Sequence, residues 1–169
     1  MDRMGAEGNA SRPRGGVVTI SDACSLGERE DASGAALREL LGTVADVVES
    51  RIIPDDRARI EETLRELAGI GLDLVLTTGG TGLGPRDVTP EATLAVVDRL
   101  VPGLAEAMRQ ESLRKTPHAM LSRGVAGARG RTLIVNMPGS PRAVWECFAV
   151  IGPVLAHAVH ILAGGGHGG

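Results

Sequence analysis

Short runs of apolar, β-branched residues alternate along this chain with stretches in which leucine or isoleucine recurs at helical spacing. The short runs predict strands over residues 17–20, 44–53, 72–77, 124–128 and 132–136. The other stretches predict helices after a Ser33 cap, over 56–68, after a Thr89 cap, over 103–115, from Pro117 and through the last apolar segment. Gly152 and Pro153 in that last segment predict a kink or two consecutive helices. This alternation is typical of an α/β fold around a mostly parallel sheet.

Length and composition fit one domain with an aliphatic core. The chain has 169 residues, of which 43% are hydrophobic and 23% are charged, and single domains usually run about 100–200 residues. Trp145 and Phe148 are the only large aromatic side chains, because tyrosine is absent. Eighteen basic and twenty-one acidic side chains give a net charge of −3. That balance argues against nucleic acid or an anionic membrane as a partner.

Both ends of the chain have the composition of tails. Residues 1–14 are small and polar, and residues 164–169 are nearly all glycine, so we expect a disordered N-terminal tail, a domain over 15–163 and a flexible C-terminal tail. No apolar run reaches the roughly 18 residues of a membrane helix. Cys24 and Cys147 form no CxxC pair or disulfide framework, which suits a reducing compartment. We therefore expect a cytoplasmic protein.

The strongest local signal is the segment TTGGTGLGPRDVTP, residues 77–90, which follows the third predicted strand. Its four glycines let the backbone approach a ligand closely, and its N–H groups can bind phosphate oxygens. The helix that follows adds the positive end of its dipole. Pro85 and Arg86 replace the Lys-Ser/Thr of a P-loop, and the spacing is not that of a dinucleotide fingerprint. The alternative is a plain glycine-rich turn between strand and helix.

Acidic residues follow two of the predicted strands. Asp87 closes the glycine segment, and Asp55-Asp56 follows the second strand. Ligands of parallel sheets collect at the carboxyl ends of the strands, so these carboxylates can converge there. Two ionised carboxylates close together imply a cation, and oxygen ligands beside phosphate favour Mg²⁺. We interpret Asp87 as a functional residue and Asp56 as a helix cap.

Two further strand ends carry polar residues. The segment NMPGSP, residues 136–141, combines a rigid turn with Ser140 at a helix start, which offers N–H groups and a hydroxyl to a ligand. An ordinary cap is the alternative for Ser140. Ser21-Asp22 follows the first strand and is open to two interpretations, a phosphate or other ligand contact or a turn.

The remaining candidates are weaker. His157 and His160 lie three residues apart without an acidic or cysteine partner at ligand spacing, so we interpret them as ordinary helix residues rather than metal ligands. Cys24 lies in a polar loop with no histidine near in sequence to activate it. Three arginines form either a solvated basic face or a surface toward an anionic substrate: Arg123, Arg129 and Arg131.

Taken together, these segments resemble one family. The segments that carry the resemblance occur in its order and at its spacing: 17–22, 28–31, 53–55, TGGTG at 78–82, RDVTP at 86–90 and NMPGSP at 136–141. The family is the molybdopterin-binding (MogA/MoaB-type) family of molybdenum cofactor biosynthesis, and the match extends over residues 15–163. The glycine segment with RDVTP is highly specific, and the PGSP turn moderately so.

The resemblance implies a three-layer α/β/α sandwich that assembles as a homotrimer or hexamer. It implies adenylylation of molybdopterin by Mg-ATP, with release of pyrophosphate, and other enzymes of the pathway as partners. It assigns Asp55 and Asp87 as catalytic carboxylates and Mg²⁺ ligands. Nucleotide, phosphate or pterin contacts fall on eight residues: Ser21, Asp22, Gly79, Gly80, Thr81, Gly82, Gly139 and Ser140. Ala23 departs from the family, in which arginine often follows Ser-Asp, so a phosphate contact there is missing or supplied by another residue.

Three other functions remain open at this point. A carrier of the same pathway would bind molybdopterin without using ATP, but two aspartates without a metal would not help it to hold a polyanion. The metal-insertion enzyme that uses the same domain normally needs further domains. An unrelated nucleotide-dependent oxidoreductase is disfavoured because the dinucleotide fingerprint is missing.

Overall fold

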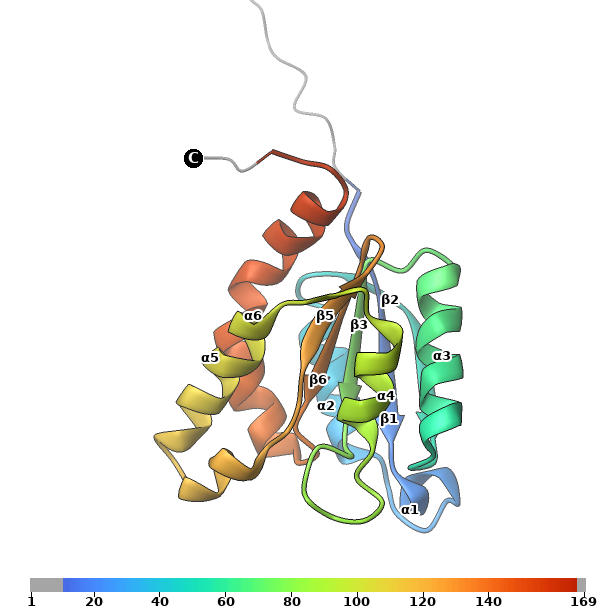
Figure 1. The fold of residues 1–169 in the computed structure, drawn as a ribbon, viewed down its shortest axis with the longest axis vertical. Helices are drawn as coiled ribbons and strands as arrows, with labels where there is room; N and C mark the ends of the chain where they lie inside the picture. Colours follow the sequence, from blue (N-terminus) through green and yellow to red (C-terminus); the bar gives the residue numbers. More distant parts are fainter. Residues whose placement is uncertain (1–10, 167–169) are drawn as a thin grey trace, which may run out of the picture.

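A computed structural model describes residues 11–166 and contains one six-stranded sheet (Figure 1). The strands lie in the order β2-β1-β3-β6-β5-β4. β1, β2, β3 and β6 are parallel, whereas β5 runs antiparallel to both of its neighbours. Their bounds are Arg14–Ile20 for β1, Asp46–Ile53 for β2, Leu74–Thr78 for β3, Arg99–Leu100 for β4, Ala126–Arg129 for β5 and Thr132–Met137 for β6.

Helices cover both faces of this sheet. Their bounds are Asp22–Ser25 for α1, Ala32–Leu41 for α2, Arg57–Gly69 for α3, Thr89–Val96 for α4, Pro102–Leu113 for α5, Pro117–Leu121 for the 3-10 helix η1 and Pro141–Leu162 for α6. α2, α5 and α6 pack on one face, and α3 and α4 pack on the other (Figure 1). The prediction of a three-layer α/β/α sandwich with a mostly parallel sheet is confirmed.

The core consists of two aliphatic layers, one on each side of the sheet. Successive side chains of a strand point to opposite faces. Val17 and Leu76 therefore pack toward α2, α5 and α6, while Val18 and Val75 pack toward α3 and α4. Because both faces are covered, the central strands are apolar at nearly every position, as is typical of parallel sheets. The sheet is thus a rigid support for the loops at its ends.

Several predicted helix ends need correction. α2 is capped by Asp31, whose Oδ1 accepts the Gly34 N–H, and not by Ser33. α4 begins at Thr89 itself, so Thr89 is not its cap; its hydroxyl donates to the Gly79 carbonyl at 3.0 Å instead. The last segment is one helix of 22 residues with Pro153 inside it, rather than two helices.

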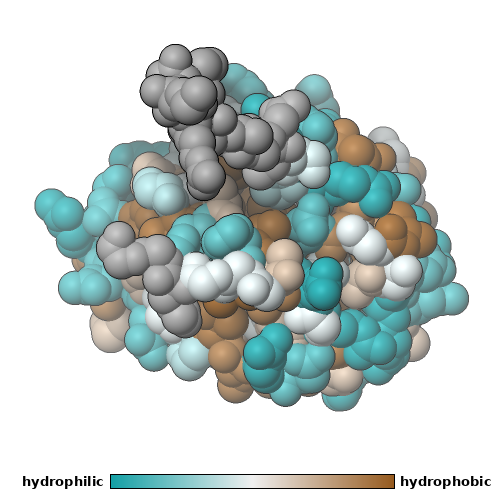
Figure 2. Space-filling model, turned by 90° about the horizontal axis from the view of Figure 1, so that it is seen from above, coloured by the Kyte–Doolittle hydropathy of each residue, from teal (hydrophilic) through white to brown (hydrophobic). Residues whose placement is uncertain are grey.

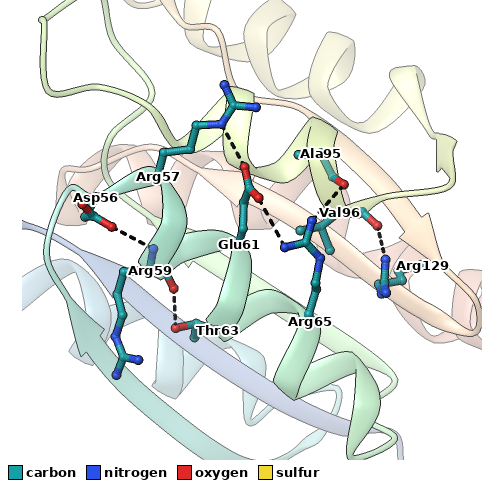
Figure 3. A network of polar contacts seen from close by, with 9 residues as sticks. All are labelled: Asp56, Arg57, Arg59, Glu61, Thr63, Arg65, Ala95, Val96 and Arg129. Atoms are coloured by element: carbon teal, nitrogen blue, oxygen red, sulfur yellow. Dashed lines mark hydrogen bonds and ion pairs between the residues drawn. The ribbon is translucent and has the colours of Figure 1, made fainter.

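The outer layer of α3 and α4 is joined by polar contacts (Figure 3). Asp56 caps α3, as expected, because its Oδ1 accepts the Arg59 N–H at 2.8 Å. Glu61 lies between Arg57 and Arg65, and Arg65 also donates to the Ala95 carbonyl of α4. These contacts fix the two helices that flank the loops after β2 and β3.

The expectation that no segment is long and apolar enough to cross a membrane needs correction, because α6 passes that test by length and composition alone. One stripe of it, which includes Val144, Ile151 and Leu155, is buried against the sheet and α2. Gly152 has no Cβ, and one there would lie 2.8 Å from the Phe148 ring. This packing is that of a core helix.

The predicted tails lie only partly within the described residues. β1 begins at Arg14, and Arg12 donates to the Gly42 and Ala45 carbonyls, so the ordered chain starts earlier than the boundary at 15. At the other end, Gly164 and Gly165 donate backbone hydrogen bonds to the last turn of α6. Residues 1–10 and 167–169 lie outside the described part.

Candidate active site

A cleft lies at the carboxyl ends of the parallel strands. β1 has β2 on one side and β3 on the other, so the chain crosses over β1 between them, and ligands of such sheets bind at this switch point. The cleft has a volume of about 220 Å³. It is lined by Thr19, Ile20, Ser21, Cys24, Arg29, Ser33, Asp55, Thr78, Gly79, Gly80, Asp87 and Gly139. The opposite end of the molecule, where β1 begins, shows hydrophilic and hydrophobic residues intermixed (Figure 2).

The floor of the cleft requires glycine at two successive positions. Gly79 and Gly80 have φ of +100° and +70°, which favour glycine strongly. A Cβ on Gly79 would lie 2.3 Å from the Ile20 carbonyl oxygen, and one on Gly80 would lie 2.3 Å from Thr89 Oγ1. Because these residues have no side chain, the backbone of Gly79 can pack directly against the end of β1, and that of Gly80 against Thr89.

Asp55 and Asp22 hold each other in place through reciprocal hydrogen bonds. The Asp22 N–H donates to Asp55 Oδ2, and the Asp55 N–H donates to Asp22 Oδ1, each at 3.0 Å. Arg86 then donates twice to the Asp22 carboxylate, at 3.0 Å to each oxygen. This ion pair lowers the pKa of Asp22. The Asp22 charge is thus matched within the protein, whereas Asp55 has no arginine partner in the described chain.

Asp87 is positioned by its own loop. Its Oδ2 accepts the Gly84 N–H at 2.9 Å, and its backbone N–H donates to the Gly84 carbonyl at 3.0 Å. A Cβ at Gly82 or Gly84 would lie 2.9 Å from the same Oδ2. The glycines of this loop therefore let the chain fold around the carboxylate.

Asp55 and Asp87 are the acidic residues that line the cleft, so theirs are the side chains there that could hold a cation such as Mg²⁺. Burial raises the pKa of Asp55, and the Asp22 and Asp87 charges raise it further. Within residues 11–166, no hydrogen bond reaches Oδ1 of either Asp55 or Asp87, and both residues line the cleft. Mg²⁺ is usually held by one or two carboxylates together with substrate phosphates. Across residues 11–166, no group of three or more acidic, histidine or cysteine side chains forms a metal site by itself.

The turn after β6 closes one side of the cleft. Thr78 Oγ1 donates to the Pro138 carbonyl at 2.7 Å, and a Cβ on Gly139 would lie 3.4 Å from the Gly79 Cα. Ser140 caps α6 by accepting the Ala143 N–H at 3.3 Å. Ser140 lines an extension of the cleft, which shares Arg29, Ser33 and Gly139 with it.

The structure brings most of the predicted site residues together. Those that line the cleft are Ser21, Asp55, Gly79, Gly80, Asp87 and Gly139. Four predicted residues lie outside its lining. Asp22 is paired with Arg86, and Ser140 lies in the extension. Thr81 and Gly82 lie further along the glycine loop. Ser21 also caps the short helix α1 by accepting the Cys24 N–H, so the turn interpretation of this residue is part of its role.

Arg123 positions the glycine loop, a role that neither of its two sequence interpretations included. Arg123 donates from Nε to the Gly82 carbonyl and from Nη2 to the Asp87 carbonyl, both at 2.8 Å, and it pairs with Glu91 at the start of α4. Its backbone N–H also donates to the Thr81 carbonyl. Arg123 therefore ties both ends of the glycine loop to the segment after η1. The carbonyl groups of this loop need hydrogen-bond donors from another part of the chain. Which residue supplies these donors is visible only in the three-dimensional structure.

A second, more apolar cavity lies across the turn from the cleft. It has a volume of about 220 Å³ and lies between α5, η1 and α6. Asn136 and Pro138 line it from the turn, and Ala105, Met108 and Cys147 line it from the helices. Burial raises the pKa of the Cys147 thiol, which keeps it neutral. The cavity therefore offers apolar walls beside the polar cleft.

This arrangement coincides with a known domain. Residues 16–157 match the model of a family described as a probable molybdopterin binding domain. The chain belongs to this family. The match begins within β1, at residue 16, and covers the other five strands and every residue that lines the cleft.

Relatives within the molybdopterin-binding family include enzymes and longer proteins. The chain is 46% identical over 152 residues to a molybdopterin adenylyltransferase of Escherichia coli, covering 85% of this chain and 78% of that protein. It is 47% identical over 150 residues to the molybdenum cofactor synthesis protein cinnamon of Drosophila melanogaster, covering 87% of this chain but only 25% of that protein. The crystal structure of the molybdopterin biosynthesis enzyme MoaB from Thermus thermophilus is 52% identical, with a TM-score of 0.85 over 90% of this chain and 97% of that one.

Proposed function

We propose that this chain is a molybdopterin adenylyltransferase of molybdenum cofactor biosynthesis, with ATP as co-substrate. The observation that carries the proposal is the pair of carboxylates of Asp55 and Asp87, which line the cleft with Gly79 and Gly80 and form no ion pair within residues 11–166. The relatives named as adenylyltransferases at 41–49% identity support it.

The reaction suits a cleft that has no histidine. The terminal phosphate of molybdopterin attacks the α-phosphate of ATP; a P–O bond forms to the AMP moiety, and the bond to pyrophosphate breaks. A phosphate nucleophile is already ionised at neutral pH, so no general base is needed. What the reaction needs is alignment of two anions and neutralisation of their charge. The Gly79 and Gly80 backbone and the dipole of α4 supply part of both.

Mg²⁺ fits the same residues. Oδ1 of Asp55 and Oδ1 of Asp87 would hold it, and when bound it would neutralise the triphosphate charge. Without a cation, the two carboxylates would repel the triphosphate in a partly desolvated cleft. We therefore infer that the aspartates are Mg²⁺ ligands and that the nucleotide enters as Mg-ATP.

The pterin would occupy the other side of the turn. Gly139 faces the cleft, while Pro138 of the same turn lines the apolar cavity between α5, η1 and α6. A fused ring requires apolar walls with a few polar groups, and this cavity provides Met108 together with Ser122 and Asn136. The terminal phosphate of the pterin would then point toward Gly139 and the cleft.

The alternative is a carrier that binds molybdopterin without turning over ATP. Incubation of the protein with molybdopterin, ATP and Mg²⁺ separates the two functions. The enzyme releases pyrophosphate in step with an AMP-linked pterin, and EDTA stops the release. A folded, pterin-loaded protein that binds the pterin equally well with or without EDTA and releases no pyrophosphate is a carrier.

Three further properties belong to the same proposal. We infer a homotrimer or hexamer, which light scattering of the purified protein measures directly, with other enzymes of the pathway as partners. We place the reaction in the cytoplasm, where Cys24 and Cys147 stay reduced; both are free in the structure. We infer that residues 15–163 form the functional domain. Arg12, Gly164 and Gly165 also form hydrogen bonds with it, so we expect melting temperature and activity to stay unchanged when only residues 1–10 and 167–169 are removed. A drop of several degrees would contradict this assignment.

A further inference from the structure

The cleft has one cationic side chain in its lining, that of Arg29. Asp55 and Asp87 line the same cleft and bring two negative charges. With two negative charges and one positive charge, this cleft binds a phosphate group well only if a cation faces the group. The same holds when a metal ion lies between the aspartates and the phosphate. The arginines around the cleft therefore decide which phosphate oxygens can be bound directly.

Two of those arginines are already engaged. Arg86 donates two hydrogen bonds to the Asp22 carboxylate. Arg123 uses all three of its nitrogen atoms on Gly82, Asp87 and Glu91. Moving either guanidinium to a ligand would break these contacts and leave an acidic side chain unpaired, which is costly.

Arg29 is different because its charge is unmatched. Its one recorded hydrogen bond runs from Nη2 to the Ser21 hydroxyl at 3.1 Å, and it forms no ion pair with any carboxylate of residues 11–166. Ser21 is buried just after β1, so this partly buried contact holds the Arg29 guanidinium at the lining of the cleft, although Arg29 as a whole is exposed. The neighbouring Ala23 brings no charge of its own.

The position of Arg29 also joins two parts of the site. It lines the cleft with Gly79, Gly80 and Asp87, and it lines the extension with Ser140 and Pro141 at the start of α6. A planar guanidinium with five N–H donors can bind phosphate oxygens in a bidentate manner. We propose that Arg29 binds a phosphate group of the substrates directly and is a substrate-binding residue of the reaction. This inference rests on the proposed function, and the phosphate is that of the nucleotide or that of the pterin.

Binding measurements without turnover test the inference. Isothermal titration calorimetry gives the Kd of Mg-ATP and, separately, of a pterin monophosphate at several salt concentrations, for wild type, Arg29→Gln and Arg29→Lys. Arg131→Gln is the matched control, because Arg131 is exposed at the turn between β5 and β6, at the opposite end of the sheet. It removes the same charge outside the cleft.

We expect Arg29→Gln to raise the Kd of at least one ligand by about tenfold or more, the scale of a hydrogen bond to a charged group. Arg29→Lys should recover part of the loss, and Arg131→Gln should bind like wild type. The Kd of the affected ligand should depend less on salt in Arg29→Gln, because a screened charge pair has been removed. If only the affinity for ATP falls, Arg29 binds the nucleotide phosphates. If only the affinity for the pterin monophosphate falls, Arg29 binds the pterin phosphate. If both affinities fall, Arg29 lies between the two ligands.

Other results overturn the inference. Unchanged binding of both ligands in Arg29→Gln excludes the contact, and so does a wild-type protein that binds neither. A weaker affinity with unchanged salt dependence and no recovery in Arg29→Lys means that Arg29 only supports Ser21. Failure of the proposed function looks different: the wild-type protein then binds the ligands and releases no pyrophosphate, while the Arg29 comparison retains its meaning.

Discussion

Acidic side chains on the surface of α3 form ion pairs with arginines, whereas those in the cleft at the end of the sheet do not. On α3, Glu61 lies between Arg57 and Arg65, with contacts of 2.8 and 3.2 Å (Figure 3). Glu62 pairs with Arg59 at 2.8 Å. In the cleft, Asp55 and Asp87 accept backbone N–H groups and form no ion pair within the described chain. The acidic groups of α3 are neutralised by arginines of the protein, whereas the unpaired carboxylates of the cleft are available to a ligand.

The largest effect should come from neutralising the unmatched pair. Asp87→Asn and Asp55→Asn should each lower the rate of pyrophosphate release by about a hundredfold or more, the scale for removing a key electrostatic group. Circular dichroism should show a normal fold, because an amide oxygen can still accept the Gly84 or Asp22 N–H. Glu61→Gln is the matched control and should keep wild-type activity. Comparable losses in Glu61→Gln and Asp87→Asn would remove the distinction between the two regions.

A smaller effect is expected from the arginine that holds the loop of the cleft. Arg123→Gln loses its contacts to Gly82, Asp87 and Glu91, so Asp87 is held less well in place. We expect an activity loss of about ten- to a hundredfold, typical of a misplaced catalytic group. Hydrogen exchange should accelerate at the amides of residues 82–87. Lost activity with unchanged exchange in that segment would mean that Arg123 acts on the substrate instead.

Stability should respond to Asp55 in the direction opposite to activity. Its folded-state pKa is raised, mainly by burial, so its ionised form opposes folding. That cost is absent below the unfolded pKa of about 3.9 and present above the raised folded pKa. In metal-free protein, Asp55→Asn should therefore be at least as stable as wild type at pH 7, and the difference should shrink as pH falls through that window. Urea unfolding at several pH values measures it, and a less stable variant at pH 7 would show that the Asp55 charge is already matched.

The smallest effect belongs to the neighbouring aspartate. Asp56 caps α3, and asparagine caps nearly as well, so Asp56→Asn should change the free energy of unfolding by less than about 0.5 kcal/mol and leave activity unchanged. Asp56→Ala should cost about 1 kcal/mol. If Asp56→Asn abolished activity and Asp55→Asn did not, the assignment of this loop would be off by one residue.

Periodicity was sufficient for the larger elements of the fold. The runs of 17–20 and 132–136 fall inside β1 and β6, and the predicted helix of 56–68 differs from α3 by one residue at each end. Both faces of these strands are covered, so their apolar pattern is strong. The two-residue strand β4 and the four-residue helix α1 were missed because segments this short carry no period.

Tertiary partners explain the remaining errors. Thr89 has the sequence of a cap, but its hydroxyl finds the Gly79 carbonyl, ten residues earlier. The sequence pattern around Arg123 predicts a basic surface or a substrate contact, yet Arg123 donates to the carbonyls of a loop about forty residues away. Arg129 likewise donates to the Val96 carbonyl (Figure 3). The identity of an arginine's partner depends on the fold, and the spacing of residues does not reveal it.

The most direct test of the central claim is the effect of Mg²⁺ on ATP binding to wild type and to Asp87→Asn. If the unmatched carboxylates hold Mg²⁺ against the triphosphate, ATP binds wild type weakly with EDTA and more tightly with Mg²⁺. In Asp87→Asn the gain from Mg²⁺ should be largely lost, and ATP should bind better than to wild type in EDTA because one repelling charge is gone. Equal ATP affinity in wild type with Mg²⁺ and with EDTA would contradict the claim.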